Sequence, residues 1–237
     1  MTEPARSASA DATTDGEAPL RIDIVSDVVC PWCVVGYRQL VLALEATGTA
    51  AEIRWHPFEL NPDMDDAGED LDEHIRGKYG ISPAESAANR ERLEDLGETL
   101  GFPIRYPQGK RMVPTFRAHR LLALAEKQGL EHEVKLALFA AYFSEDRDVN
   151  DPETLANIAS TCGLDRDEVL DFLTGDRLAT EVRERERVWI ERGITGVPAM
   201  VFDGKYLVTG AQGEARYAAV LERVRGAAAG AAPAGTA

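Results

Sequence analysis

The pattern of hydrophobic and polar positions predicts two strands that flank a helix near the start of the chain. Residues 21 to 29 form an apolar run, which is typical of a buried strand. From Cys30 onward apolar residues recur at helical spacing until Gly48, where we expect the helix to end. Residues 53 to 60 predict a second strand, which ends at Asn61-Pro62. This order predicts a βαβ unit with Cys30 at the junction of strand and helix.

The stretch from Pro62 to about Arg185 has helical spacing throughout. Two of its predicted helices are acidic and suit a solvated surface, whereas two others are apolar on at least one face. Aspartates followed by Pro or Glu indicate the starts of two more, because these residues cap helix N-termini. The predicted helices are Asp70 to Tyr79, Pro83 to Leu100, Phe116 to Gln128, Glu131 to Phe143, one starting at Asp151-Pro152, one starting at Asp165 with Glu168, and about Asp176 to Arg192.

The end of the chain returns to strands. Pro198 to Phe202 and Lys205 to Val208 flank Asp203-Gly204, a pair that suits a type I′ turn in a β-hairpin. A helix from Gly213 to Val224 completes the pattern. The predicted order of elements is therefore a βαβ unit, an all-helical block, and an αββα unit.

Composition and charge narrow the range of partners. The chain has 44% hydrophobic and 28% charged residues, as a soluble globular protein does, and no window approaches the ~18 apolar residues of a membrane span. Its formal net charge of −15 argues against nucleic acid and anionic membranes, which bind through Lys and Arg. We expect residues 1–19 and 226–237 to be disordered tails. Because the first residues lack the segments of a signal peptide, we expect a cytoplasmic protein.

The cysteines are too few for a disulfide framework, since the chain holds 3 of them. Cys30 and Cys33 form a CxxC in a βαβ setting, which favours a redox pair. A zinc site needs two further ligands, and no second CxxC or HxxxH spacing is present, so we expect no metal. Cys162 lies on the apolar face of its predicted helix, where we expect a buried, inert thiol.

The start of a helix is a favourable place for a thiolate. Its unpaired N–H groups and the positive end of its dipole stabilise an anion. We therefore expect the pKa of Cys30 to lie well below the ~8.5 of a free thiol, which makes Cys30 the nucleophile. Pro31 fixes φ for entry into the helix. Cys33, one turn further on, is placed to resolve a mixed disulfide by attacking Cys30.

Two specific motifs and several supporting ones give the chain a family resemblance. The specific motifs are Cys30-Pro31-Trp32-Cys33 and Gly196-Val197-Pro198. The supporting ones are Asp27-Val28-Val29, Phe58-Glu59-Leu60-Asn61-Pro62, Ala118-His119-Arg120-Leu121 and Gly210-Ala211-Gln212. With these motifs the chain resembles the DsbA-like thioredoxin family, and within it the FrnE-like branch of cytoplasmic oxidoreductases. The resemblance implies an α/β chain with a thioredoxin-like fold, formed by residues 20–62 and 186–225 and interrupted by a large all-helical insertion at residues 63–185.

The resemblance also implies a substrate-binding loop. Val197-Pro198 is expected to be a cis peptide beside Cys30, where an extended substrate backbone can pair with the chain. Trp32, exposed between the cysteines, is a further candidate for substrate contact.

Other polar residues are weaker candidates. Asp27 and Glu59 are candidates to accept the proton of Cys33, although charged residues at strand ends are usually solvated. His56 and His119 have no nucleophile nearby in the sequence, so we expect hydrogen-bonded packing roles for both.

These residues predict a dithiol-disulfide oxidoreductase acting on peptide or protein disulfides by exchange or isomerisation, with no cofactor. A small thiol such as glutathione or mycothiol is a further candidate partner. One alternative is a glutathione-dependent isomerase or transferase of the 2-hydroxychromene-2-carboxylate or kappa type, although those carry Ser in place of the first cysteine. Another is a noncatalytic, chaperone-like accessory protein. The direction of exchange and the oligomeric state stay open.

Overall fold

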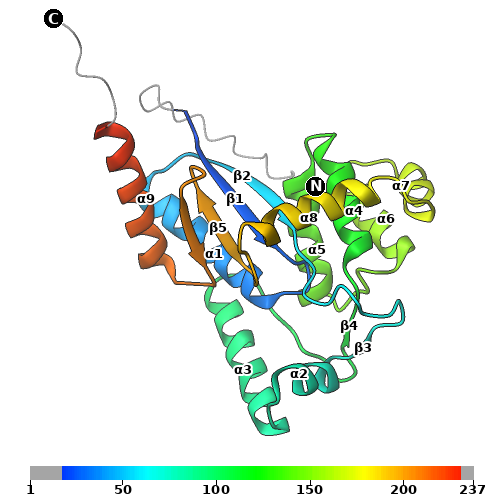
Figure 1. Cartoon of the computed structure of the whole chain (residues 1–237). Helices are drawn as coiled ribbons and strands as arrows, with labels where there is room; N and C mark the ends of the chain where they lie inside the picture. The colour runs from blue at the N-terminus through cyan, green and yellow to red at the C-terminus, as the bar shows by residue number, and fades with distance from the viewer. Residues whose placement is uncertain (1–17, 231–237) are drawn as a thin grey trace, which may run out of the picture.

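The centre of the molecule is a four-stranded sheet. The computed structural model describes residues 18–230 and orders the strands β2-β1-β5-β6. The strands are β1 (Leu20–Ser26), β2 (Ala51–Pro57), β5 (Ala199–Phe202) and β6 (Tyr206–Thr209). β1 runs parallel to β2, with Ile22 opposite Ile53, and antiparallel to β5, with Ile22 opposite Phe202. The sheet therefore brings the two ends of the described chain together (Figure 1).

Helices cover both faces of this sheet. Side chains alternate across β1, so Ile22 and Ile24 pack into the large core with Tyr217, whereas Val25 packs with Trp189 on the opposite face. The first face belongs to α1 (Pro31–Thr47) and α9 (Glu214–Gly230), which also pack on each other. The second belongs to α8 (Ala179–Glu191). This layering holds the start of α1 at one end of the sheet.

The segment between β2 and β5 is mostly helical. Figure 1 shows two groups of helices, with α2 and α3 beside α1 and with α4 to α7 at the side of the sheet. The helices are α2 (Leu71–Tyr79), α3 (Pro83–Thr99), α4 (Phe116–Glu126), α5 (Glu131–Phe139), the π-helix η1 (Ala140–Ser144), α6 (Pro152–Thr161) and α7 (Arg166–Thr174), followed by α8. These elements confirm the predicted class, a thioredoxin-like α/β fold interrupted by helices.

Capping side chains begin several of these helices. Asp151 accepts a hydrogen bond from the Thr154 N–H and is followed by Pro152 in the first turn, as predicted. The Asp165 side chain accepts a hydrogen bond from the Glu168 N–H, which is one of the two hydrogen bonds of the predicted capping box. The hairpin turn also agrees with its prediction, since Asp203 has φ 51 and Gly204 has φ 66.

The structure differs from the predicted elements in several places. β1 ends at Ser26 rather than Val29, because a turn closed by the Cys30 N–H and the Asp27 C=O (3.4 Å) precedes α1. The helix predicted over Glu131 to Phe143 divides into α5 and η1. A small antiparallel sheet of β3 (Glu69–Asp70) and β4 (Arg111–Met112) adds strands to the segment expected to be all helical.

The predicted domain boundary and one predicted tail both overlap helices of the structure. The boundary at residues 185 and 186 falls inside α8, which packs on the sheet, so the division into a thioredoxin-like unit and an insertion stays a prediction. Helix α9 continues to Gly230, five residues into the stretch expected as a tail, because Ala residues favour helix. The remaining tail residues, 1–17 and 231–237, lie outside the described part of the chain. Between residues 18 and 230, no helix combines the length and apolar character needed to cross a membrane.

Two helical glycines provide a test of how α3 packs. A Cβ added at Gly97 would lie 2.6 Å from the Phe102 carbonyl oxygen, whereas nothing lies within 4 Å of a Cβ at Gly77 in α2. We predict that Gly97→Ala lowers the free energy of unfolding by ~1–3 kcal/mol through this clash. Gly77→Ala should raise it by up to ~1 kcal/mol, because alanine is the better helix former. Thermal unfolding of both variants measures the contrast, and equal shifts would contradict the packing of α3 on the segment that follows it.

Candidate active site

The two cysteines of the CxxC lie at the start of α1. Cys30 is the N-cap residue, with φ −89 and ψ 111, and Pro31 follows it in the first turn. The Cys33 N–H donates to the Cys30 carbonyl oxygen at 3.0 Å, which winds the first turn. Cys30 and Cys33 are 3% and 0% exposed, but only Cys30 lines a cavity that opens beside the helix. A substrate can therefore reach Cys30, while Cys33 lies behind it.

The loop before β5 contacts the sulfur of Cys30. The Cys30 Sγ donates a hydrogen bond to the Val197 carbonyl oxygen at 3.6 Å, and the Val197-Pro198 peptide is cis. Both features confirm what the motif predicted. Helix α1 also approaches Pro198 closely, because a Cβ on Gly36 would lie 3.1 Å from the Pro198 Cγ. Gly36 therefore lets the helix and the loop meet.

The pKa values of the two thiols depend on each other, because each thiol acts on the other through a hydrogen bond. The hydrogen bond with Cys33 and burial raise the pKa of Cys30 well above its usual value. Burial also acts to raise the pKa of Cys33, but hydrogen bonds from Cys30 and Ser26 and the charge of Lys135 outweigh it and lower that pKa. The raised pKa of Cys30 is opposite in direction to the low pKa expected from its place at the helix start, because the buried thiols are coupled through their shared hydrogen bond.

Asp27 is a buried carboxylate whose charge acts on Cys30. Its Oδ2 accepts a hydrogen bond from the Leu60 N–H at 2.8 Å, and its Oδ1 lies 3.4 Å from the His119 Nε2 without a hydrogen bond of its own. Burial acts to raise the pKa of Asp27, but the neighbouring His119 and the Leu60 N–H outweigh it, so the pKa lies below its usual value. Asp27 is therefore a buried carboxylate with an open acceptor, not the solvated residue typical of a strand end.

Lys135 of α5 is the charged residue that the sequence analysis missed. It is 1% exposed, and its Nζ lies 5.2 Å from the Trp55 ring centroid and 4.8 Å from that of Phe139. Burial lowers its pKa to about 8, although the charges of Cys33 and Asp27 act in the opposite direction. A signal was present in the sequence, because Lys135 shares a helical face with Leu138 and Phe139, where a lysine is out of place.

Glu59 belongs to a hydrogen-bond network with α8. It pairs with Arg183 of α8, and its backbone N–H donates to the Glu186 Oε1 at 2.6 Å. Burial raises the pKa of Glu59 to about 7. Within the described residues no hydrogen bond or ion pair joins Glu59 to either cysteine. Its contacts tie the segment after β2 to α8.

The remaining candidates have packing roles. His119 Nε2 lies 3.1 Å from the Phe58 carbonyl oxygen, and His56 Nε2 lies 2.8 Å from the Asp23 Oδ1, which confirms the hydrogen-bonded roles expected of both histidines. Cys162 is the C-cap of α6 and is half-buried, so the expectation of a fully buried thiol was wrong. Burial raises the pKa of Cys162, which keeps it protonated at neutral pH.

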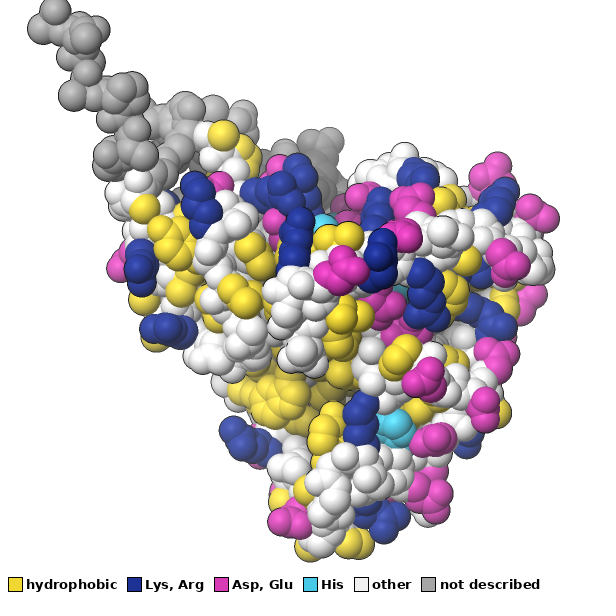
Figure 2. Space-filling model, viewed as in Figure 1, with side chains coloured by type: hydrophobic (Ala, Val, Ile, Leu, Met, Phe, Trp, Pro, Cys, Tyr) yellow, Lys and Arg dark blue, Asp and Glu magenta, His cyan; other side chains and the backbone are white. Residues whose placement is uncertain are grey.

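A cavity of about 430 Å³ opens beside Cys30. Its walls are mostly apolar and come from the start of α1, from α2 and α3, and from the Val197 loop. Figure 2 shows a hollow lined by hydrophobic side chains between the sheet and the α2–α3 pair. Trp32 is 38% exposed and forms part of the wall. The cavity therefore lies between the sheet and the helical segment, beside the sulfur of Cys30.

Comparison with known proteins fits this geometry. The family described as DSBA-like thioredoxin domain matches residues 21–222. The chain belongs to this family. The DsbA-like chain is 26% identical over 197 residues to the uncharacterized protein YwbO of Bacillus subtilis, a match that covers 82% of this chain and 92% of that protein.

Solved structures of DsbA-like proteins have the same architecture. A probable DsbA oxidoreductase from Streptomyces coelicolor matches with a TM-score of 0.82 and 33% identity, over 87% of this chain and 90% of that one. The cytosolic disulfide reductase DsbM from Pseudomonas aeruginosa, solved with GSH, shares the fold at a TM-score of 0.59 and 18% identity, over 87% and 100% of the two chains. Family and fold together support a thiol-disulfide oxidoreductase.

The raised pKa of Glu59 predicts how its replacement changes with pH. A carboxyl group with a raised pKa stabilises the folded state below its unfolded pKa, and this stability is lost as pH rises toward about 7. The Glu59→Gln variant has no carboxyl group to ionise at this position, so it does not lose this stability as pH rises. Relative to wild type, its free energy of unfolding should therefore increase between pH 5 and pH 8 in urea titrations. The exposed Glu91→Gln serves as control, and parallel pH profiles for wild type and Glu59→Gln would contradict the prediction.

Proposed function

We propose that the protein carries out thiol-disulfide exchange on peptide or protein disulfides, with Cys30 attacking and Cys33 resolving. The contact between the Cys30 Sγ and the Val197 carbonyl oxygen is the observation that carries this proposal. In this contact the sulfur of Cys30, which lines the cavity, lies against the backbone of the half-buried Val197. The Cys30 thiolate attacks one sulfur of the substrate and the other leaves as a thiolate. Cys33 then attacks Cys30, which forms the enzyme disulfide and releases the second thiol.

Val197, Pro198 and Trp32 would position the substrate. The loop before β5 lies beside Cys30, so an extended peptide could pair with its backbone as an added strand. Trp32 offers apolar contact area at the edge of the cavity. Because backbone pairing is independent of side chains, this mode of docking suits many sequences.

Asp27 is the proposed proton acceptor for the exchange. Its Oδ1 has no hydrogen bond, and its carboxylate acts on Cys30 by raising the pKa of that thiol. A buried base near Cys33 would take its proton when Cys33 attacks the mixed disulfide. Pro31 would hold the entry into α1, and Glu59 would act only through the position of the segment after β2.

Partners and location are part of the proposal. The neighbour DsbM was solved with GSH, which supports a small thiol such as glutathione or mycothiol as a second reactant. Cytoplasmic location and the absence of a cofactor also stay predictions. A glutathione-dependent isomerase stays an alternative function, because 2-hydroxychromene-2-carboxylate isomerase has the same fold. A chaperone-like accessory protein would bind substrates without exchange.

Single cysteine variants test the order of attack. We predict that Cys30→Ser abolishes insulin reduction by dithiothreitol, because no other described thiol lines the cavity. Cys33→Ser should retain the first attack and accumulate mixed disulfides, since only the second step needs Cys33. Mass spectrometry of the trapped adducts distinguishes the two variants. Equal trapping by both would reverse the assigned roles, and Cys162→Ala serves as control.

Asp27→Asn tests the buried carboxylate. Removing a negative charge beside the thiols lowers the pKa of Cys30, because Asp27 raises it in the native protein. We predict that the pH midpoint of Cys30 alkylation shifts down in Asp27→Asn while release of the mixed disulfide slows. Asp23→Asn is the matched control, since Asp23 is equally buried on β1 but pairs with Arg21 and His56. An unchanged midpoint in Asp27→Asn would remove the carboxylate from the proposed chemistry.

A further inference from the structure

The cavity beside Cys30 has the size and lining of a small-molecule site. Its volume, about 430 Å³, lies within the ~300–1,000 Å³ typical of ligand pockets. Aromatic and aliphatic side chains form most of its wall, among them Trp32, Ile81, Leu93, Tyr106 and Phe143. Such a wall suits an apolar body close to the attacking sulfur, and an extended peptide backbone would leave much of it empty.

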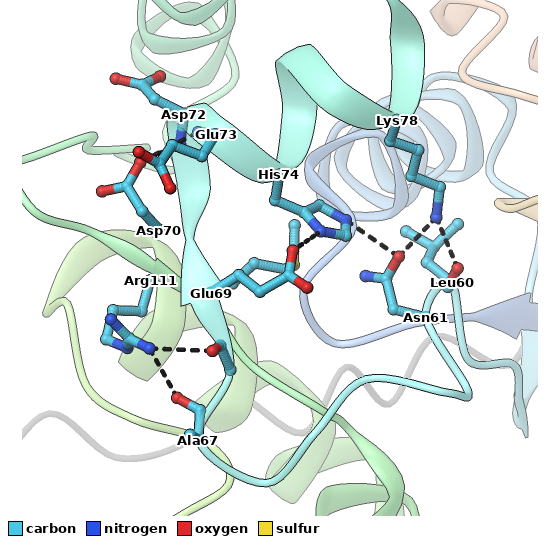
Figure 3. A network of polar contacts seen from close by, with 12 residues as sticks. Leu60, Asn61, Ala67, Glu69, Asp70, Asp72, Glu73, His74, Lys78 and Arg111 are labelled. Carbon is cyan, nitrogen blue, oxygen red and sulfur yellow. Dashed lines mark hydrogen bonds and ion pairs between the residues drawn. The ribbon is translucent and has the colours of Figure 1, made fainter.

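Lys78 of α2 places a positive charge on the wall of this cavity. Its Nζ donates to the Leu60 carbonyl oxygen at 2.6 Å and to the Asn61 Oδ1 at 2.5 Å. Figure 3 shows Lys78 and His74 of α2 both reaching Asn61. Both acceptors of Lys78 are neutral, so they hold the side chain in place without cancelling its charge. An ammonium group has three N–H donors, which leaves one for a ligand.

Arg92 of α3 places a second charge nearby. Its guanidinium lies 6.0 Å from the centroid of the Trp32 ring, which lines the cavity. Within residues 18–230, neither Arg92 nor Lys78 forms an ion pair, whereas the lining residues His74 and Arg90 pair with Glu69 and Asp72. Lys78 lines the pocket and Arg92 lies beside the Trp32 ring that lines it, so two cations without an ion pair stand at this site in a chain of net charge −15.

We propose that the cavity binds a low-molecular-weight disulfide that combines an apolar, preferably aromatic, body with a carboxylate. The apolar body fills the wall, and the carboxylate lies toward Lys78 and Arg92. This inference names a substrate class for the exchange proposed above and rests on it. The reaction balances as that exchange does: the reduced enzyme supplies two electrons, the small disulfide leaves as two thiols, and Cys30 and Cys33 become a disulfide.

Three probe disulfides separate body from charge. Dithiodibenzoate has both features, its diamide keeps the aromatic body without the charge, and dithiodipropionate keeps the charge without the ring. Stopped-flow mixing with reduced enzyme gives a second-order rate constant for the reduction of each probe. Dividing it by the rate constant for reduction of the same probe by dithiothreitol corrects for the probe's intrinsic reactivity. Wild type should prefer dithiodibenzoate over both others, and the preference over the diamide should fall with added salt.

Variants of Lys78 and Arg92 test the role of the two cations. Lys78→Met and Arg92→Met should each lower the rate with dithiodibenzoate by about threefold, as expected for charges partly screened by solvent, and leave the diamide unchanged. Lys205→Met, in the distant hairpin turn, is the matched control. If either variant slows the diamide as much as dithiodibenzoate, the cations do not recognise an anion and the proposal is overturned.

Filling the cavity tests the role of its apolar body. Asn89 is exposed on α3 and lines the cavity, whereas its neighbour Ala88 is exposed and does not. Asn89→Trp should slow both aromatic probes more than tenfold, while Ala88→Trp should not. If wild type reduces insulin but shows no preference among the probes, the small-disulfide proposal fails and the exchange activity stands. If neither insulin nor any probe reacts, the exchange activity itself is wrong.

Discussion

The approach of helix α1 to the Val197-Pro198 loop is the constraint on which the rest of the site depends. The two come together because β1 and β5 are neighbours in the sheet, and Gly36 allows the close approach, since a Cβ there would lie 3.1 Å from the Pro198 Cγ. Once they meet, the reachable sulfur of Cys30 faces the Val197 carbonyl oxygen, and the cavity forms along the same edge. The helical segment between β2 and β5 closes that cavity from the other side.

Burial gives this site its electrostatic character. At an exposed helix start, the N–H groups would favour a thiolate on Cys30, but here the loss of water raises the cost of any charge. Charged groups of both signs act on this buried region. They are the carboxylate of Asp27, which lies next to His119, and the ammonium group of Lys135 from α5. The thiolate is therefore shared between two cysteines and their surroundings, and no single residue determines where it lies.

The sequence predicts the parts of this site that depend on local order along the chain. The CxxC at a strand-to-helix junction and most helix starts follow from spacing and capping residues, whereas the Val197-Pro198 loop beside Cys30 is what the family resemblance implies. Lys135 and the cavity do not, because hydrophobic periodicity shows which face of α5 is buried but not what it is buried against. The same limit applies to Asp27, whose burial depends on His119 and Leu60, which approach from other elements. The direction of the Cys30 pKa shift was misjudged because neither the hydrogen bond with Cys33 nor the extent of burial can be read from neighbours in the sequence.

The position of Lys135 has a consequence for proton balance. The negative charge of the reduced cysteines helps to keep this buried ammonium protonated, and its pKa of about 8 is already close to neutral. When the cysteines join as a disulfide, that charge disappears and the ammonium holds its proton less tightly. The charge of the dithiol and the charge of Lys135 therefore act on each other, although Lys135 lies on a helix outside the central sheet. The helical segment therefore does more than enclose the cavity, because its Lys135 interacts electrostatically with the CxxC.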